Sequence, residues 1–140
     1  MRKCQLDIEK SREVYESFKD YIKVKECYNN VYNVFELNLD FFREGKLKVA
    51  YGYVEVMAGL YCRHCFILDE SGKVIDPTIF VQSEQRLQRE YYVMAVFDDV
   101  DEYLTAIMDD DCMPALDRYF RERDKKAQEW AIDNGVIFVG

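Results

Sequence analysis

Hydrophobic residues in the first part of the chain recur with the period of an α-helix. Over 6–23 the apolar side chains are three or four positions apart, as one buried helix face requires. The same spacing continues over 26–43, and Gly45 is placed to end this second helix. Cys27 falls in the first turn of the second helix, on its inward face. The pattern therefore predicts two N-terminal helices.

The hydrophobic period changes to two after Gly45, where apolar and polar residues begin to alternate. Alternation, or a high content of Val, Ile and Tyr, marks four segments as β-strands: 46–57, 60–69, 73–75 and 90–97. Pro77 ends or flanks the third strand, because proline cannot donate a hydrogen bond to a neighbouring strand. Short turns link the first three strands, and this predicts an antiparallel arrangement.

Helical spacing returns toward the end of the chain. It predicts helices over 99–109 and 114–133, with Pro114 near the first turn of the second of these. Asn134-Gly135 caps that helix, and 136–139 forms a closing strand. We therefore expect an α+β fold, with N-terminal helices packed on a central antiparallel sheet of about four to five strands and followed by C-terminal helices.

The composition is that of one folded domain spanning 1–140. Hydrophobic residues make up 49% of the chain and aromatic residues 15%, which is enough to bury a core and excludes a disordered chain. The formal net charge of -8 argues against DNA or RNA as a partner. The chain shows neither a signal peptide nor an apolar stretch long enough to span a bilayer, so we expect a cytoplasmic protein with no membrane partner.

Acidic residues gather in two runs, at 98–102 and 109–111. Two explanations remain open for them. They can cap helices and solvate helix ends, or the second run can supply oxygen ligands to a cation. The Asp-x-Asp-x-Asp-Gly spacing of a calcium loop is absent, so we expect no metal and no cofactor.

The five cysteines of a cytoplasmic chain are expected to be free, catalytic or metal-bound, not paired in disulfides. Cys62 and Cys65 lie on either side of His64, the only histidine, which raises the alternative of a zinc site. On a strand, however, the two cysteines point to opposite faces. Structural zinc sites also need a second pair of ligands, and the sequence has no such pair.

Cys27, His64 and Asp76 supply, in this chain order, the thiol, imidazole and carboxylate of a cysteine hydrolase. The positive end of the helix that starts near Cys27 favours its thiolate. His64 then takes the thiol proton, and Asp76 orients the ring. Two simpler roles remain open: Cys27 can fill the core, and Asp76 can form a turn with the Pro-Thr that follows it.

The hairpin between the His64 strand and the Asp76 strand provides a geometric condition for this hypothesis. With a three-residue loop over 70–72, and Gly72 in the left-handed region, Asp76 falls opposite Phe66. It then shares a face with His64 and lies diagonally across from it, within side-chain reach. A two-residue loop would place Asp76 on the other face. The hypothesis therefore predicts a loop of odd length or a bulge.

Four pieces of the chain occur in the order Cys27 at a helix start, Tyr53-Val54-Glu55, His64-Cys65-Phe66 and Gly72-Lys73-Val74-Ile75-Asp76-Pro77-Thr78. Over about residues 25–80 this order resembles the transglutaminase-like branch of the papain-like cysteine hydrolases. That group presents its nucleophile at a helix start, its histidine on one strand and its Asp or Asn on the next. The resemblance implies a papain-like core with Cys27, His64 and Asp76 as the catalytic triad.

Two functions are consistent with these residues. The first is a cysteine-dependent acyl hydrolase or transferase (an amidase, a peptidase or a transglutaminase-like enzyme) acting on a peptide or a small acyl substrate. The second is a catalytically inactive interaction module of the same fold, whose acidic surface binds a basic protein partner. The second is favoured by Cys65-Phe66, where related sequences have a small residue and Trp, and by the lack of Gly beside Cys27.

Overall fold

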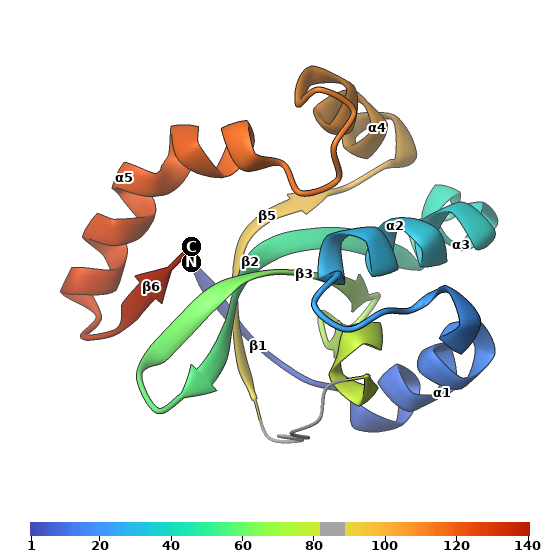
Figure 1. Ribbon diagram of the computed structural model, residues 1–140, viewed down its shortest axis with the longest axis horizontal. Helices are drawn as coiled ribbons and strands as arrows, with labels where there is room; N and C mark the ends of the chain where they lie inside the picture. The colour runs from blue at the N-terminus through green and yellow to red at the C-terminus, as the bar shows by residue number, and fades with distance from the viewer. Residues whose placement is uncertain (82–88) are drawn as a thin grey trace.

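The computed structural model describes residues 1–81 and 89–140, and it has an α+β architecture (Figure 1). Its elements follow in the order β1 (Arg2–Gln5), α1 (Ile8–Phe18), the 3-10 helix η1 (Lys19–Tyr21), α2 (Cys27–Leu37), α3 (Leu39–Arg43), β2 (Leu47–Met57), β3 (Leu60–Asp69), β4 (Val74–Ile75), the 3-10 helix η2 (Pro77–Phe80), β5 (Glu90–Phe97), α4 (Val100–Asp109), α5 (Asp117–Asp133) and β6 (Ile137–Val139). Within the described residues, no helix combines the length and the apolar character needed to cross a membrane.

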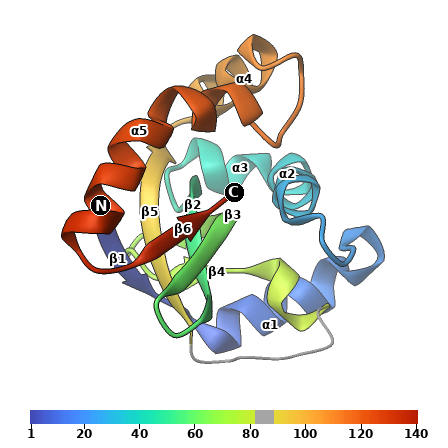
Figure 2. The same cartoon turned by 60° about the vertical axis from the view of Figure 1, so that its left-hand side comes forward.

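The described strands form one mixed sheet of six strands in the order β1-β5-β2-β3-β4, with β6 paired to β3. The α+β class is confirmed, but the prediction of an antiparallel sheet with four to five strands is wrong in two respects. Strand β1 gave no sequence signal, because only Cys4 among its four residues is buried. Strand β6 pairs with β3 in parallel, because α5 returns the chain to the N-terminal end of β3, at Leu60 (Figure 2).

The sheet curls, so its two faces have different surroundings. Leu6, just after β1, forms a parallel bridge with Val74 of β4, and the Asp7 N–H donates to the Val74 carbonyl at 2.8 Å. A small buried cluster fills the inner side of the curl: Cys4, Ala50, Val54, Phe66, Leu68, Val74, Tyr91 and Val93. The buried faces of α2, α3, α4 and α5 pack on the outer side.

The outer side is dominated by aromatic rings. Ring contacts join the buried side chains Phe35, Tyr51, Tyr53, Phe97, Tyr103 and Phe120. A buried tyrosine needs a partner for its hydroxyl, and Tyr51 donates to the Pro114 carbonyl at 2.6 Å. This contact ties the segment before α5 to the sheet.

The expected helices exist, but their ends differ from the prediction. The first begins at Ile8, after the N-cap Asp7, and stops at Phe18. The second is broken at Asn38 into α2 and α3. The last begins at Asp117 and not at 114, because Leu116 adopts a left-handed conformation with φ of 52° and interrupts the helical backbone.

The two acidic runs have structural roles at helix starts. Asp99 accepts a hydrogen bond from the Glu102 N–H at 2.8 Å and caps α4. Asp110 is buried and accepts from the backbone N–H groups of Arg118 and Tyr119 in the first turn of α5. Within 1–81 and 89–140, no group of three or more His, Cys, Asp or Glu side chains is placed to hold a metal ion. Each run therefore supplies one residue that caps a helix, Asp99 for α4 and Asp110 for α5.

Candidate active site

The hairpin between β3 and β4 has the predicted geometry. Ile67 pairs with Ile75 and Leu68 with Val74, and the Asp69 N–H donates to the Lys73 carbonyl at 3.0 Å. The loop is therefore Glu70-Ser71-Gly72, with Gly72 at a φ of +82°. The odd loop length is confirmed, and it places the residue after β4 on the face that His64 occupies.

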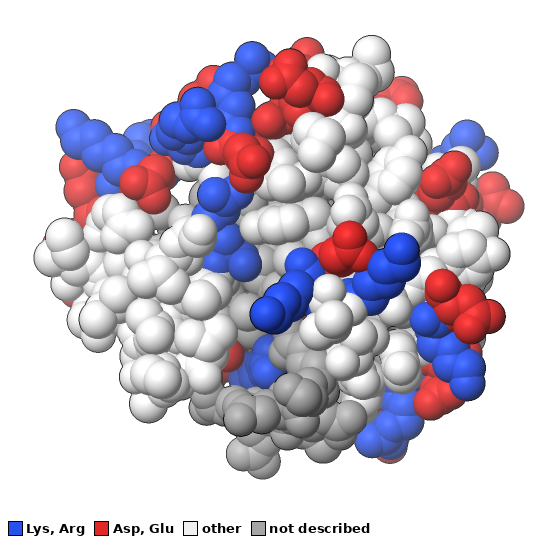
Figure 3. Space-filling model, in the orientation of Figure 1, with Lys and Arg blue, Asp and Glu red and all other residues white. Residues whose placement is uncertain are grey.

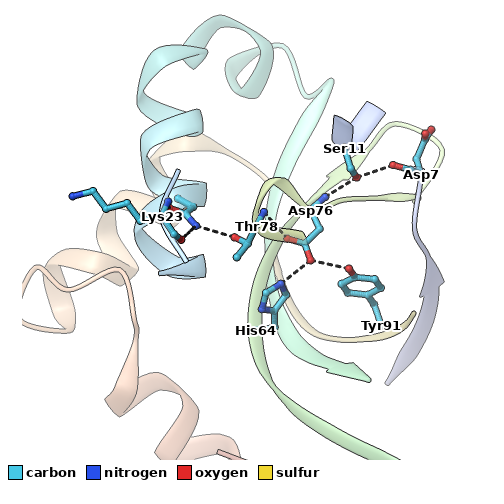
Figure 4. Close-up of polar contacts among 8 residues, drawn as sticks. Asp7, Ser11, Lys23, His64, Asp76, Thr78 and Tyr91 are labelled. Carbon is cyan, nitrogen blue, oxygen red and sulfur yellow. Dashed lines mark hydrogen bonds and ion pairs between the residues drawn. The ribbon is translucent and has the colours of Figure 1, made fainter. Parts of the chain in front are cut away.

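His64 and Asp76 form a buried hydrogen-bonded pair. His64 Nε2 lies 2.8 Å from Asp76 Oδ2, and the two residues are 5% and 0% exposed (Figure 4). Because Nε2 is engaged by the carboxylate, Nδ1 is the ring nitrogen left for another partner. Asp76 also has the turn role that the sequence left open, since its Oδ1 accepts from the Thr78 N–H at 3.1 Å. The two roles of Asp76 hold together.

Two further residues hold Asp76 in place, one at its carboxyl group and one at its backbone N–H, and sequence analysis identified neither. Tyr91 of β5 donates its hydroxyl to Asp76 Oδ2 at 2.7 Å. Ser11 of α1, which is fully buried, accepts from the Asp76 N–H at 2.9 Å and donates to the Asp7 carbonyl at 2.7 Å. Figure 4 shows these side chains converging on Asp76 from separate elements. Asp76 is therefore fixed from both sides of the curl.

Gly52 is the one feature of the sequence that indicates how closely β5, which carries Tyr91, approaches β2. It faces His64 in the pairing of β2 with β3, and the pairing of β2 with β5 shifts register between Tyr51 and Gly52. A Cβ at this position would lie 1.9 Å from the Tyr92 carbonyl oxygen, so only glycine fits there. An isolated glycine within a strand pattern indicates a bulge or a close backbone approach, and here it indicates both.

The charges of the pair are strongly coupled. Burial by itself lowers the pKa of His64, but the Asp76 carboxylate and the neighbouring Cys27 sulfur outweigh it and raise the pKa to about 10. Burial by itself raises the pKa of Asp76, yet His64 and the hydrogen bonds from Tyr91 and Thr78 hold it below its usual value of 3.8. The folded protein therefore favours an imidazolium paired with a carboxylate.

Cys27 is the first residue of α2, as predicted. It lies beside the part of β3 that has no neighbouring strand on one edge. On the edge that faces away from β2, β3 pairs with β6 only at 60–62 and with β4 only at 67–68. In the described part of the chain no strand covers 63–66 on that edge, and α2 contacts β3. Cys27 and His64 both line a cleft of about 620 Å³ at this gap.

Asn30, another buried residue without a role in the sequence analysis, links the start of α2 to the segment that carries Asp76. Its side-chain amide bonds both backbone groups of Lys23, each at 2.8 Å. The same amide nitrogen donates to Thr78 Oγ1 at 3.0 Å. These bonds fix the positions of three segments relative to one another: the loop before Cys27, helix α2 and the turn after Asp76.

Cys62 and Cys65 lie on opposite faces of β3, as alternation predicts. Cys65 is fully buried against the aromatic layer, where desolvation by burial raises the pKa of its thiol. Cys62 lines the cleft together with His64. This separation keeps the two thiols from binding one metal ion together.

The structure thus places all three residues singled out by the sequence around one gap in the sheet. His64 and Asp76 are in direct contact, and Cys27 lines the cleft beside His64 and influences its charge. The additional residues that position them are Ser11, Asn30, Gly52 and Tyr91. Comparisons with protein-family models, with curated proteins and with solved structures find no match for this chain.

Proposed function

We propose that the protein is a cysteine-dependent acyl hydrolase or acyl transferase that acts on amide or thioester bonds. In this proposal Cys27 is the nucleophile, His64 is the general base and acid, and Asp76 is a positioning residue that acts through His64. The observation that carries the proposal is the buried 2.8 Å contact between His64 and Asp76, beside a cleft that Cys27 also lines. Titratable groups perturbed by burial and a specific partner, next to a cleft, are typical of active sites.

Before substrate binds, the Cys27 thiol proton is transferred to His64, since the raised pKa of His64 favours the imidazolium. Since Asp76 engages Nε2, Nδ1 is the nitrogen that accepts this proton. The raised pKa of His64 makes the transfer more favourable than transfer to a free imidazole. The sulfur then attacks the acyl carbon, and an electron pair of the carbonyl moves onto its oxygen.

The second step releases the leaving group. The electron pair returns to the carbonyl carbon, the bond to the amine or thiol breaks, and His64 donates its proton to that group. The acyl group remains on the Cys27 sulfur as a thioester. Water or an amine then attacks this thioester and loses a proton to His64. The bond between the acyl carbon and the Cys27 sulfur breaks, the sulfur leaves as a thiolate beside the protonated His64, and the acyl group is released by hydrolysis or transfer.

The start of α2 supports this chemistry through its backbone. Cys27 is the first residue of the helix, so its N–H has no helical carbonyl to bond. Such an N–H is a suitable donor for the oxygen that becomes negative in the tetrahedral intermediate. The nucleophile and one oxyanion donor would then belong to the same residue.

Alkylation with iodoacetamide near neutral pH tests the proposal, because the chain contains its own reference thiol. Cys112 is exposed, whereas Cys27 is only partly exposed. We expect Cys27 to react faster than Cys112 in the folded protein, because the reactive form is the thiolate and His64 stabilises it. Peptide mass mapping over a time course measures both rates in one sample.

Two variants complete this test. His64→Gln should slow alkylation of Cys27 by about tenfold or more and leave the rate of Cys112 unchanged. Cys27→Ala should abolish turnover of any thioester or amide substrate found for the protein. If folded wild-type Cys27 reacts no faster than Cys112, and His64→Gln does not change its rate, the protein is not a cysteine hydrolase, and an inactive interaction module becomes the better explanation.

A further inference from the structure

The cleft at Cys27 has the opposite charge balance to the rest of the protein. The chain has 27 acidic and 19 basic residues, with a net charge of -8. Yet among the described residues the cleft is lined by Lys25, Arg63 and Arg89, and Asp117 is the only acidic side chain of that lining. Figure 3 shows several Lys and Arg side chains near the middle of this face, where β3 and the start of α2 lie, with an acidic side chain between them. A basic cleft on an acidic protein favours an anionic ligand.

Arg63 is the best-placed of these cations. It directly precedes His64 on β3, and its guanidinium carbon lies 4.0 Å from the centroid of the Phe120 ring. Its Nη2 donates to Asp117 Oδ1 at 3.0 Å, while 22% of the side chain remains exposed. Stacking and one ion pair hold the planar group in a fixed orientation, which reduces the entropy lost when it binds a ligand.

The hydrogen-bonding capacity of Arg63 is not used up by these contacts. A guanidinium has five N–H donors, and its Nε atom is buried without a hydrogen-bond partner in the described part of the chain. Buried donors normally have partners, so an incompletely bonded arginine at a cleft needs an explanation other than fold stability. Carboxylates are the ligands that this planar group binds best among the groups of an acyl substrate.

We propose that the cleft binds an acyl substrate that carries a carboxylate close to the bond under attack, and that Arg63 binds this carboxylate. This inference rests on the function proposed above and specifies its substrate class. Arg63 and His64 are neighbours on one strand and both line the cleft. A carboxylate on Arg63 therefore holds the adjoining acyl group beside His64 and Cys27, and Lys25 adds to the attraction.

Two alkylating reagents of similar size test the charge preference at Cys27. Iodoacetate carries a carboxylate and iodoacetamide a neutral amide, so the ratio of their rates measures attraction of the anion. We expect the ratio at Cys27 to exceed that at the exposed Cys112. Arg63→Gln should lower the ratio at Cys27 about threefold or more, since one unit charge is removed close to the reagent. His64 is present in both proteins, so its own attraction for iodoacetate cancels.

Matched variants keep this test interpretable. Arg121→Gln removes the same charge from α5, in a neighbouring hollow, and should leave the ratio at Cys27 unchanged. Arg63→Lys should retain most of the preference. If Arg63→Gln does not fold, Lys25→Gln removes a charge from the exposed rim and should lower the ratio by a smaller factor.

Competition distinguishes the two sources of such a carboxylate. Protection of Cys27 from iodoacetamide by succinate indicates a small acyl substrate, and protection by a capped glutamyl peptide but not its glutaminyl analogue indicates an acidic peptide. An unchanged ratio in Arg63→Gln, or protection by neither competitor, overturns the inference. Normal reaction of Cys27 with iodoacetamide in that case leaves the proposed function intact, whereas failure of Cys27 to react with either reagent overturns the function as well.

Discussion

The two faces of β3 are equally buried but are built from different kinds of contact. Toward the helices, Cys65 and Ile67 join the aromatic layer, in which almost every contact is apolar. Toward the inside of the curl, His64 is bonded to the Asp76 carboxylate, which also accepts hydrogen bonds from β5 and η2. The backbone N–H of Asp76 donates to Ser11 of α1. Adjacent positions on one strand thus supply either core packing or a charged centre.

This contrast indicates that the outer aromatic layer and the His64–Asp76 pair contribute differently to the stability of the fold. Burial of aromatic surface is strongly favourable, and the outer layer supplies it. A buried ion pair gives little or no net stability compared with well-packed apolar groups, but removing one partner costs about 3–5 kcal/mol, because the other is left uncompensated. The His64–Asp76 pair therefore has no advantage for stability over apolar side chains in its place, and this supports the chemical role that we propose for it.

The largest effect on stability is expected on the aromatic side. Phe35→Ala should lower the free energy of unfolding by about 3–5 kcal/mol, because the ring is 2% exposed and contacts Phe42 and Tyr103. Urea denaturation measures this change. Phe41→Ala, at a side chain 48% exposed, should change stability far less. Below the denaturation midpoint the alkylation rate of Cys27 should stay at its wild-type value; a large loss would mean that the two faces are not separable.

Asp76→Asn should be nearly as costly, about 3 kcal/mol, because it leaves the His64 ring buried without its counter-charge. It should also lower the pKa of His64 from about 10 to below its ordinary 6.5, since burial then acts with less opposition. His64 is the only histidine, so its NMR titration is unambiguous. The exposed Asp98→Asn is the control and should change neither quantity appreciably. A wild-type pKa near 6.5 would contradict the paired geometry.

The dependence of stability on pH follows from the same pair and should be intermediate in size. The pKa of His64 is raised, so its contribution is complete below about pH 6.5 and is lost as the pH rises through about 10. The pKa of Asp76 is lowered, so its contribution is present above about 3.8 and is lost on acidification. Between pH 7 and 10, wild type should therefore lose stability more steeply than His64→Gln, as measured by urea denaturation at each pH. Parallel curves for the two proteins would contradict the charged pair.

The smallest expected effect on stability comes from removing single buried tyrosine hydroxyls, one on each side of the sheet. Tyr91→Phe removes a hydrogen bond to a charged carboxylate and should cost about 1.5–3 kcal/mol. Tyr103→Phe removes a hydroxyl whose nearest partner, Tyr51 Oη, is 3.5 Å away, and should cost less than about 1 kcal/mol. Thermal or urea unfolding measures both. Equal losses of stability would show that a hydrogen bond to the Asp76 carboxylate contributes no more than a hydroxyl in the aromatic layer.

Much of the candidate site could be predicted from sequence because its key contact is local. His64 and Asp76 are twelve positions apart and joined by a hairpin, so loop length and side-chain alternation fix their relative faces. The start of α2 at Cys27 was likewise readable from helical spacing. The partners Ser11 and Tyr91 were not, since they reach Asp76 from 65 and 15 positions away through the curl of the sheet.

The sequence by itself determined the α+β class, the helix start at Cys27 and the parity of the hairpin, because these depend on backbone geometry over a few residues. Only the tertiary structure decided that β6 runs parallel to β3, that a gap between β6 and β4 admits the start of α2, and that basic side chains line the resulting cleft. These features arise where segments distant in sequence pack together, and no periodic pattern of residues records which of them will meet.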